Sequence, residues 1–394
     1  MSAPGAPRPA GGPRPLAGRP SVPWPRAGVV AEQLFGPVPG GIGRYVGALA
    51  RHLPAVAGDG GGSVRWITAR HPAARLAGAG LDPAATTALA LPGRLATRSW
   101  VRLRRPRLPG RLLAALDLVH ATSAAVPPAP GRALVATVHD LGFHHHPETY
   151  PPAGRRFHER ATRIVVAEAA RVLVPSRATA RDLAEVYGLE PDRVALTPLG
   201  VELPPRDPAP ARRLLAELGV RGPFLLAVGT LEPRKNLRRL LGAFADSAEE
   251  LPDHHLVVAG PVGWGPALRP THDLVRVKLA GPVDDATLHG LYAAADGLAY
   301  PSLYEGFGLP VLEAMAHGTP VLTSERSSLP EVAGEAALLV DPTDQAAIAA
   351  GLLRLVGDQA LRARLAAAGP RRAARFTWPA TAAATWAAYL EALA

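Results

Sequence analysis

Short runs of apolar residues alternate along the chain with longer stretches in which apolar residues recur at helical spacing. In the first half, the apolar runs occupy residues 64–70, 116–123, 133–141, 171–177 and 193–201. Several are almost continuously apolar, as in parallel strands that helices cover on both faces. Helical patterns occupy 156–170 and 176–188, the latter with Ser176 as N-cap and Gly188 as C-terminal stop. The alternation predicts a doubly wound α/β domain.

The same pattern begins again in the second half. Its apolar runs occupy residues 224–231, 254–260, 275–281, 297–302, 320–324 and 336–341. Between the two sets, the stretch GVELPPRDPAPARR (200–213) contains four prolines, which interrupt regular structure and indicate a hinge. We expect two Rossmann-like domains, 27–202 and 203–377, facing each other across a cleft, and a closing helix over 378–394 that crosses back to the first domain.

Length and composition agree with this organisation. A chain of 394 residues suits two domains of about 200 residues each. No run of about 18 apolar residues predicts a membrane span. Residues 1–26 are mostly Pro, Gly, Ala and Arg without the apolar centre of a signal peptide, so we expect a disordered tail. The absence of cysteine excludes disulfides and thiolate metal sites and agrees with a cytoplasmic location.

The chain carries a net charge of +10, mostly from arginine. Such a charge suits an anionic partner: a phosphorylated ligand, an acidic lipid surface or a nucleic acid. A compositional bias toward Arg, Ala, Pro and Gly is the alternative. A nucleic-acid-binding function is disfavoured, because the sequence has no recognisable module for it and aromatic residues make up only 5%.

Two adjacent cations follow a predicted strand. In VGTLEPRKNLRRLLGAF (228–244), the strand leads to a turn with Gly229, and Arg234 and Lys235 stand at the entrance of a helix. Cations and unpaired backbone N–H groups at the carboxyl end of a strand suit a diphosphate. The alternative is a solvated surface pair. A glycine-rich turn at the corresponding place after another strand favours the diphosphate.

That turn lies in SLYEGFGLPVLEAMAHGTPV (302–321), where Glu305 and Glu313 flank Gly306 and Gly308. Eight residues along a helix rise about 12 Å, which exceeds the roughly 5–9 Å between the two carboxylates of a glycosidase. We therefore interpret the glutamates as holding two ends of one elongated ligand. Glu313 would bind a ribose diol, and Glu305 a sugar beyond the phosphates. The alternative makes Glu313 an ordinary residue of the helix surface.

The first domain offers further candidates. The glycines of PVPGGIGRYVGALARHL (37–53) fit a structural turn and an anion cradle equally well. His139 and Asp140 end a strand, where functional polar residues are common. The histidines at 144–146 favour a polar loop over a metal site, because neighbours in an extended loop point in different directions.

A basic segment of the first domain, RSWVRLRRPRLPGRLLAAL (98–116), places six arginines among Trp100, Val101, Leu103 and Leu108. The mixture would suit an anionic membrane that carries a lipid-linked acceptor. A solvated basic loop is the favoured alternative, since two prolines break any continuous helix there.

Several motifs together resemble those of a known family. They are GGIGRYV, VHDLGF, VPSRATARDL, PRKNL, PSLYEGFGLPVLEAMAHGTPVLTS and SSLPEVAGEAALLVDP. The combination resembles the retaining glycosyltransferases of family 4, which have the GT-B fold and include bacterial mannosyltransferases. The resemblance runs from about residue 29 to the end. It implies a nucleotide-sugar donor held mainly by the second domain and an acceptor held mainly by the first.

The resemblance also implies roles for single residues. Arg234 and Lys235 would bind the donor diphosphate, Glu313 the ribose and Glu305 the hydroxyls of the donor sugar. His139 would lie near the transferred sugar. Backbone groups near the phosphates would come from Gly41, Ile42, Gly306, Phe307, Gly308 and Leu309.

The expected reaction leaves a nucleoside diphosphate anion, which the two cations and a helix N-terminus would stabilise. The chain has no DxD motif, so the cations would replace Mg²⁺, and neither metal nor cofactor is expected. No residue is a clear covalent nucleophile. Retention would follow from attack on the same face, with a donor phosphate oxygen taking the acceptor's proton. Closure of the lobes about 201–210 would exclude water.

The sequence does not identify the donor or the acceptor. A GDP- or UDP-hexose is expected, with GDP-mannose suggested by the family and base recognition near 281–285. The acceptor would be a glycan, a lipid-linked sugar or a small molecule, as in polysaccharide biosynthesis. An epimerase or phosphorylase with the same fold is the alternative chemistry.

Overall fold

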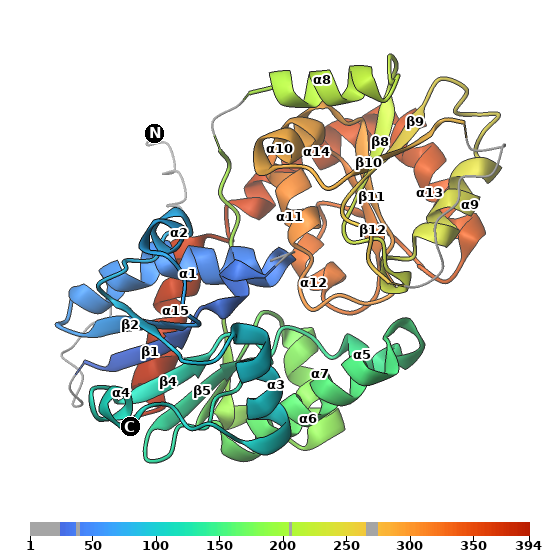
Figure 1. The fold of residues 1–394 in the computed structure, drawn as a ribbon. Coiled ribbons are helices and arrows are strands. Elements are labelled where there is room, and N and C mark those ends of the chain that lie inside the picture. Colours follow the sequence, from blue (N-terminus) through green and yellow to red (C-terminus); the bar gives the residue numbers. More distant parts are fainter. Residues whose placement is uncertain (1–23, 37–39, 205–206, 265–274) are drawn as a thin grey trace, which may run out of the picture.

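The protein consists of two α/β domains, each built on one parallel sheet (Figure 1). The structure is a computed structural model that describes residues 24–36, 40–204, 207–264 and 275–394. The first sheet has seven strands in the order β3-β2-β1-β4-β5-β6-β7, and the second has six in the order β10-β9-β8-β11-β12-β13. Each order reverses once, between β1 and β4 and between β8 and β11. Such reversals open the crevices in which doubly wound folds bind ligands.

The strands of the first sheet are β1 (Arg26–Val30), β2 (Ser63–Thr68), β3 (Thr86–Ala88), β4 (Leu118–Ala121), β5 (Ala133–Thr137), β6 (Arg171–Val174) and β7 (Val194–Leu196). Those of the second are β8 (Phe224–Val228), β9 (His255–Ala259), β10 (Val277–Gly281), β11 (Gly297–Tyr300), β12 (Val321–Ser324) and β13 (Leu338–Val340). Every predicted apolar run overlaps a strand, which confirms the α/β prediction. The sequence interpretation missed β1, which adjoins the Pro-rich tail, and the three-residue edge strand β3.

Helices cover both sheets. In the first domain they are α1 (Gly40–Gly58), α2 (Ala73–Gly78), α3 (Gly93–Leu103), α4 (Gly110–Ala114), α5 (Gly142–His145), α6 (Pro152–Glu168) and α7 (Arg177–Tyr187). The remaining helices are α8 (Ala209–Glu217), α9 (Leu237–Asp246), α10 (Asp285–Ala294), α11 (Leu309–Ala316), α12 (Leu329–Ala333), α13 (Gln345–Gly357), α14 (Gln359–Ala373) and α15 (Trp378–Glu391). The predicted caps of α7 are confirmed: Ser176 accepts a hydrogen bond from Thr179 N, and Gly188 has a φ of 65°.

Three boundaries differ from the prediction. The predicted tail, 1–26, lies largely outside the described residues, but Arg26 opens β1 and the ring of Trp24 lies 5.9 Å from that of Trp386. The Pro-rich stretch 200–213 is not irregular throughout, because α8 begins at Ala209. A proline is tolerated in the first turn of this helix, where a backbone N–H would have no partner within the helix. The glycines of the GGIG motif open α1 instead of preceding it, since the helix begins at Gly40.

The last helix, α15, belongs in space to the first domain, where it lies beside α1 (Figure 1). A buried hydrogen-bond network attaches it there. His120 Nδ1 lies 2.7 Å from Tyr389 Oη, and His120 Nε2 lies 2.8 Å from Thr137 Oγ1. Tyr45 Oη, on α1, is 3.0 Å from the same Thr137 oxygen. The network therefore joins α1, β4, β5 and α15.

This network predicts a pH-dependent stability. Burial, and to a lesser degree the neighbouring His139, lowers the pKa of His120 from 6.5 to about 3, so the folded protein keeps the imidazole neutral. The unfolded chain binds a proton there near pH 6.5, so this contribution is complete above pH 6.5 and declines as the pH falls, by up to about 1.4 kcal/mol per pH unit. We expect the stability difference between wild type and His120→Gln, measured by urea denaturation, to shrink between pH 7 and pH 5. A difference that does not change with pH would contradict the assignment.

Candidate active site

The cation pair and the glycine turn follow neighbouring strands of the second sheet. Arg234 and Lys235 belong to a 3-10 helix, η4 (Pro233–Lys235), after β8, and Glu305 follows β11. These two strands are hydrogen-bonded to each other, and the strand order reverses between them. Their carboxyl ends therefore open onto the ligand crevice, and the structure brings the two motifs together there.

Glu305 accepts hydrogen bonds from both cations. Arg234 Nη1 donates to Oε2 at 2.9 Å, and Lys235 Nζ donates to Oε1 at 2.7 Å. The hydroxyl of Tyr300 donates to Oε1 at 2.9 Å. The side chains are nearly buried, with exposed fractions of 12% for Arg234, 13% for Lys235 and 9% for Glu305. Burial alone would raise the pKa of Glu305, but the two cations lower it to about 2, so the carboxylate is ionised.

Arg234 has further partners in the same loops. It donates to the carbonyl oxygen of Tyr304 at 2.7 Å and to Glu232 Oε1 at 2.8 Å. Burial raises the pKa of Glu232, which sequence reasoning missed because an acidic residue beside a basic pair is common on surfaces. The Nε of Arg234 is buried and has no hydrogen-bond partner among the residues the structure describes. This N–H of the guanidinium thus remains available as a hydrogen-bond donor.

Gly306 lies directly against the first domain. A Cβ at this position would lie 1.8 Å from the carbonyl oxygen of His139, so the close approach requires glycine. The domains also meet nearby, where the carboxylate of Glu331 accepts a hydrogen bond from the backbone N–H of Arg177 at 2.9 Å. The turn is thereby held between the two lobes.

The apolar side chains of the turn point into the protein interior. Phe307 is 5% exposed, and its ring lies 5.7 Å from that of Phe376. Leu309 is also buried. Ser328 donates its hydroxyl to the carbonyl oxygen of Phe307 at 2.9 Å, and Gly308, with a φ of 109°, leads the chain into α11. A ligand would therefore meet the backbone of Phe307 and not its ring.

His139 presents a neutral imidazole at the domain boundary. Its Nε2 lies 2.9 Å from the carbonyl oxygen of Thr122, and its ring is edge-on to that of Tyr45 at 5.1 Å. Burial lowers the pKa of His139, so the ring is uncharged at neutral pH. Because a carbonyl oxygen can only accept, Nε2 carries the proton and Nδ1 is a hydrogen-bond acceptor.

Glu313 lies within α11 and is buried, which excludes the alternative of a helix-surface residue. Its Oε2 accepts a hydrogen bond from the hydroxyl of Tyr292 at 2.9 Å, and its Oε1 accepts one from the guanidinium of Arg44. Sequence reasoning missed Arg44, although it belongs to the GGIGRYV motif. The two partners are 269 positions apart, so no local spacing signals the contact.

Gly41 and Ile42 belong to the first turn of α1. A Cβ at Gly41 would lie 3.5 Å from Leu309 Cδ1, at the start of α11. The N-termini of α1 and α11 thus face each other across the domain boundary. Each carries the positive end of its helix dipole, so an anion between them would be stabilised from both sides.

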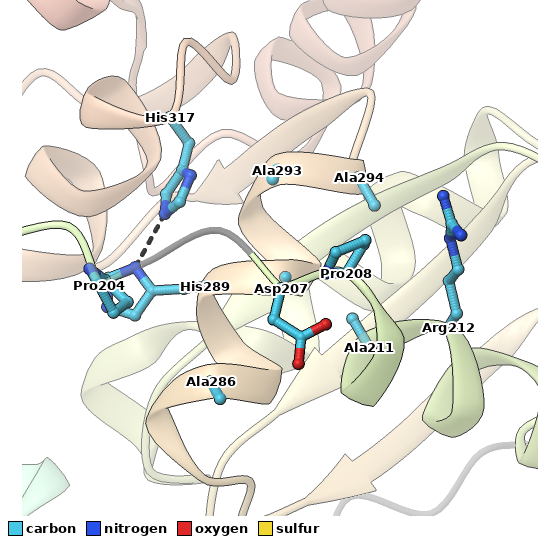
Figure 2. A pocket seen from close by; sticks show the side chains of 11 residues that line it. Pro204, Asp207, Pro208, Ala211, Arg212, Ala286, His289, Ala293, Ala294 and His317 are labelled. Carbon is cyan, nitrogen blue, oxygen red and sulfur yellow. Dashed lines mark hydrogen bonds between the residues drawn. The ribbon is translucent and has the colours of Figure 1, made fainter.

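Two pockets open beside these elements. One of about 550 Å³ borders the cation loop and includes Glu232 and Trp264 in its wall. The other, of about 240 Å³, lies between Pro204, α8 and α10 (Figure 2). Its wall includes Asp207, Arg212 and two histidines, with His289 Nδ1 2.8 Å from His317 Nε2. The larger pocket borders the loop that carries the cations, but neither Arg234 nor Lys235 is part of its wall.

Among the described residues, no group of three or more His, Cys, Asp or Glu side chains is arranged to hold a metal ion. The predicted polar loop at 144–146 is wrong in part, because His144 and His145 end the short helix α5; His145 Nε2 lies 3.1 Å from Asp182. Within the same described residues, no helix has the length and apolar character needed to cross a membrane.

The sequence matches two family models in succession. The model described as Glycosyltransferase Family 4 matches residues 39–204, and the model described as Glycosyl transferases group 1 matches residues 217–372. O-antigen chain mannosyltransferase B of Escherichia coli is 36% identical over 256 residues, which cover 62% of this chain and 66% of that protein. D-inositol 3-phosphate glycosyltransferase of Kineococcus radiotolerans is 37% identical over 268 residues, which cover 61% of each. The chain thus spans less than two thirds of the length of these relatives.

Solved structures share the fold over nearly the whole chain. HepE of Anabaena in complex with UDP-glucose has a TM-score of 0.68 and 20% identity, over 93% of this chain and 99% of that one. WaaG, a glycosyltransferase involved in lipopolysaccharide biosynthesis, has a TM-score of 0.62 and 20% identity, over 88% of this chain and 95% of the WaaG chain. At this identity, the likeness concerns the fold.

The contact at Gly306 can be tested by substitution. In Gly306→Ala the new methyl group would clash with a backbone oxygen that cannot move alone, so we expect a loss of about 1–3 kcal/mol or more in the free energy of unfolding. The matched control is Gly154→Ala in α6, where a Cβ meets nothing within 4 Å. That change should stabilise the helix by about 0.5–1 kcal/mol. Equal stability of the two variants in urea denaturation would contradict the packing described.

Proposed function

Since the chain belongs to family 4 of the glycosyltransferases and has the GT-B fold, we propose that it transfers a hexosyl group from a nucleotide-diphosphate sugar with retention of configuration. One observation carries the proposal: Arg234 and Lys235 are held against the glycine turn at the strand reversal of the second domain. Fixed, nearly buried cations are suited to a charge that develops as a bond breaks.

The leaving group determines what the site must do. When the anomeric C–O bond of the donor breaks, the negative charge collects on the nucleoside diphosphate. The unused Nε–H of Arg234, the ammonium of Lys235 and the opposed N-termini of α1 and α11 would stabilise that charge. Because Glu305 already holds Arg234 and Lys235 in position, little reorganisation of these cations would accompany the reaction.

The other residues would position the donor. Glu313 would accept hydrogen bonds from the ribose diol, and Glu305, whose carboxylate orients both cations, would reach the hydroxyls of the donor sugar. His139 would accept a hydrogen bond from the sugar through Nδ1. Backbone N–H groups of Gly41, Ile42 and the turn from Gly306 to Leu309 would contact the phosphates.

We propose a GDP- or UDP-hexose as donor. Relatives carry the name mannosyltransferase, which favours a mannosyl group and GDP-mannose, whereas the related HepE structure contains UDP-glucose. A glycan, a lipid-linked sugar or a small molecule would accept the hexose. The same-face route needs no protein nucleophile, because a donor phosphate oxygen removes the proton from the acceptor. The cations would act without a metal ion or cofactor.

We further propose that the protein works at the inner face of a membrane, through an arginine patch on the first domain. The patch consists of exposed side chains that make no ion pair within the described residues: Arg94, Arg98, Arg102, Arg105, Arg107 and Arg111. Leu95 and Leu103 are exposed beside it, whereas Trp100, Val101 and Leu108 are buried. Electrostatic attraction to anionic lipids, rather than insertion of apolar side chains, would therefore drive the contact with the membrane. The alternative is that the patch is only a solvated basic surface.

The catalytic proposal predicts a large effect of one ammonium group. Lys235→Ala should lower kcat/KM for sugar transfer by about 100-fold or more, because one donor to the developing charge is lost. The chain has one other lysine, Lys278, on β10, and Lys278→Ala is the matched control, expected to keep full activity. Equal activity of the two variants would contradict the site. Release of nucleoside diphosphate only when acceptor is present would exclude an epimerase or phosphorylase.

The membrane proposal predicts a charge-specific loss of binding. Arg98→Glu with Arg102→Glu should weaken binding to vesicles of phosphatidylglycerol and phosphatidylcholine by about 10-fold or more, since each basic residue near such a surface contributes about 1 kcal/mol. The control, Arg354→Glu with Arg364→Glu, changes the net charge equally on helices of the second domain. If both double variants bind the vesicles equally, the patch is only a solvated surface.

A further inference from the structure

Both carboxylate oxygens of Glu313 already have partners within the protein. Tyr292 donates to Oε2 at 2.9 Å from the neighbouring helix α10, and Arg44 donates to Oε1. The Glu313 side chain is 6% exposed, whereas that of Arg44 is 32% exposed. Arg44 also comes from the facing domain, whereas Tyr292 is fully buried in the same domain as Glu313. Of the two partners, Arg44 is the one that can leave.

A second carboxylate lies ready to receive this guanidinium. Arg44 Nη2 is 3.1 Å from Asp285 Oδ1, at the start of α10, and the Asp285 side chain is 79% exposed. A guanidinium that releases Glu313 therefore keeps a counterion without crossing the crevice. Exchange between the two carboxylates avoids the cost of an unpaired charge.

We propose that Arg44 gates the donor site by occupying Glu313 until the ribose diol of the nucleotide replaces it. The proposal rests on the proposed function, which assigns the ribose to Glu313. On donor binding, the two hydroxyls take over the oxygens of Glu313, and Arg44 moves onto Asp285. Before donor binding, the ion pair neutralises a buried carboxylate and joins α1 to α11 across the domain boundary.

The gate makes a prediction about ribose hydroxyls. A nucleotide that lacks them cannot displace Arg44, so only nucleotides with a diol compete with the ion pair. In Arg44→Ala the competitor is absent. We therefore expect the ratio of the Kd of a 2′,3′-dideoxynucleoside diphosphate to that of the ribonucleoside diphosphate to rise about five-fold, the effect of a partly exposed ion pair. Both nucleotides carry a diphosphate, so the loss of one positive charge in Arg44→Ala changes both Kd values by the same factor. That general effect therefore cancels in the ratio.

Calorimetric titration of the full chain with GDP, UDP and their 2′,3′-dideoxy forms measures this ratio of Kd values. Arg51→Ala is the matched control: Arg51 lies on the same helix and pairs with Glu202 at 3.6 Å, but does not touch Glu313. The control should leave the ratio unchanged. Without nucleotide, Arg44→Ala should melt below wild type because Glu313 loses its counterion. Arg44→Gln, which keeps hydrogen-bonding capacity without charge, replaces the alanine variant if that variant fails to fold.

The possible results are distinct. A ratio unchanged in both Arg44 variants would overturn the gate while leaving the transferase intact. A ratio that falls would make Arg44 a direct ligand of the ribose and would also overturn it. Failure of the wild-type protein to bind either ribonucleotide would instead contradict the proposed function, and the gate with it.

Discussion

The architecture of the crevice depends on one buried interaction, the carboxylate of Glu305 between Arg234 and Lys235. The two cations follow β8 and the carboxylate follows β11, so the ion pairs join the two loops at the point where the strand order reverses. Without this carboxylate, Lys235 would lose its ion-pair partner and Arg234 would keep only Glu232, so two nearly buried cations would share one carboxylate. The same contact fixes the turn whose Gly306 lies against the backbone of His139. One side chain thus sets the electrostatics of the site and the spacing of the lobes.

Fixing the cations during folding has a chemical consequence. An arginine or lysine free in solvent must lose rotamer freedom and hydration when a phosphate arrives. Here most of both losses has already occurred on folding, because Glu305 holds the two nearly buried side chains in position. The carboxylate also prevents the cluster from repelling itself before an anion binds. In the proposed reaction, Glu305 would therefore position the two groups that stabilise the developing charge.

The sequence predicted most of the architecture because its information there is local. Continuous apolar runs marked the interior strands, and Ser176 and Gly188 marked the ends of α7. The edge strand β3 was missed because its sequence, TTA, is only partly buried and does not form an apolar run. At the site, strand ends and glycines indicated Arg234, Lys235 and the turn. The partners of those residues were not visible: Arg44 and Glu313 meet only because two domains fold against each other. Pairings set by tertiary structure leave no mark in a single sequence.

The attachment of α15 has a consequence for how this protein is made on the ribosome. Residues 27–202 leave the ribosome long before Tyr389, which completes the hydrogen-bond network of His120. During that interval the first lobe exposes the surface that α15 later covers, including the site of Trp386. The hydrophobic core of the first domain can be completed only after the whole second domain and α15 have been synthesised. Vectorial synthesis therefore delays completion of the first domain to the last step of assembly.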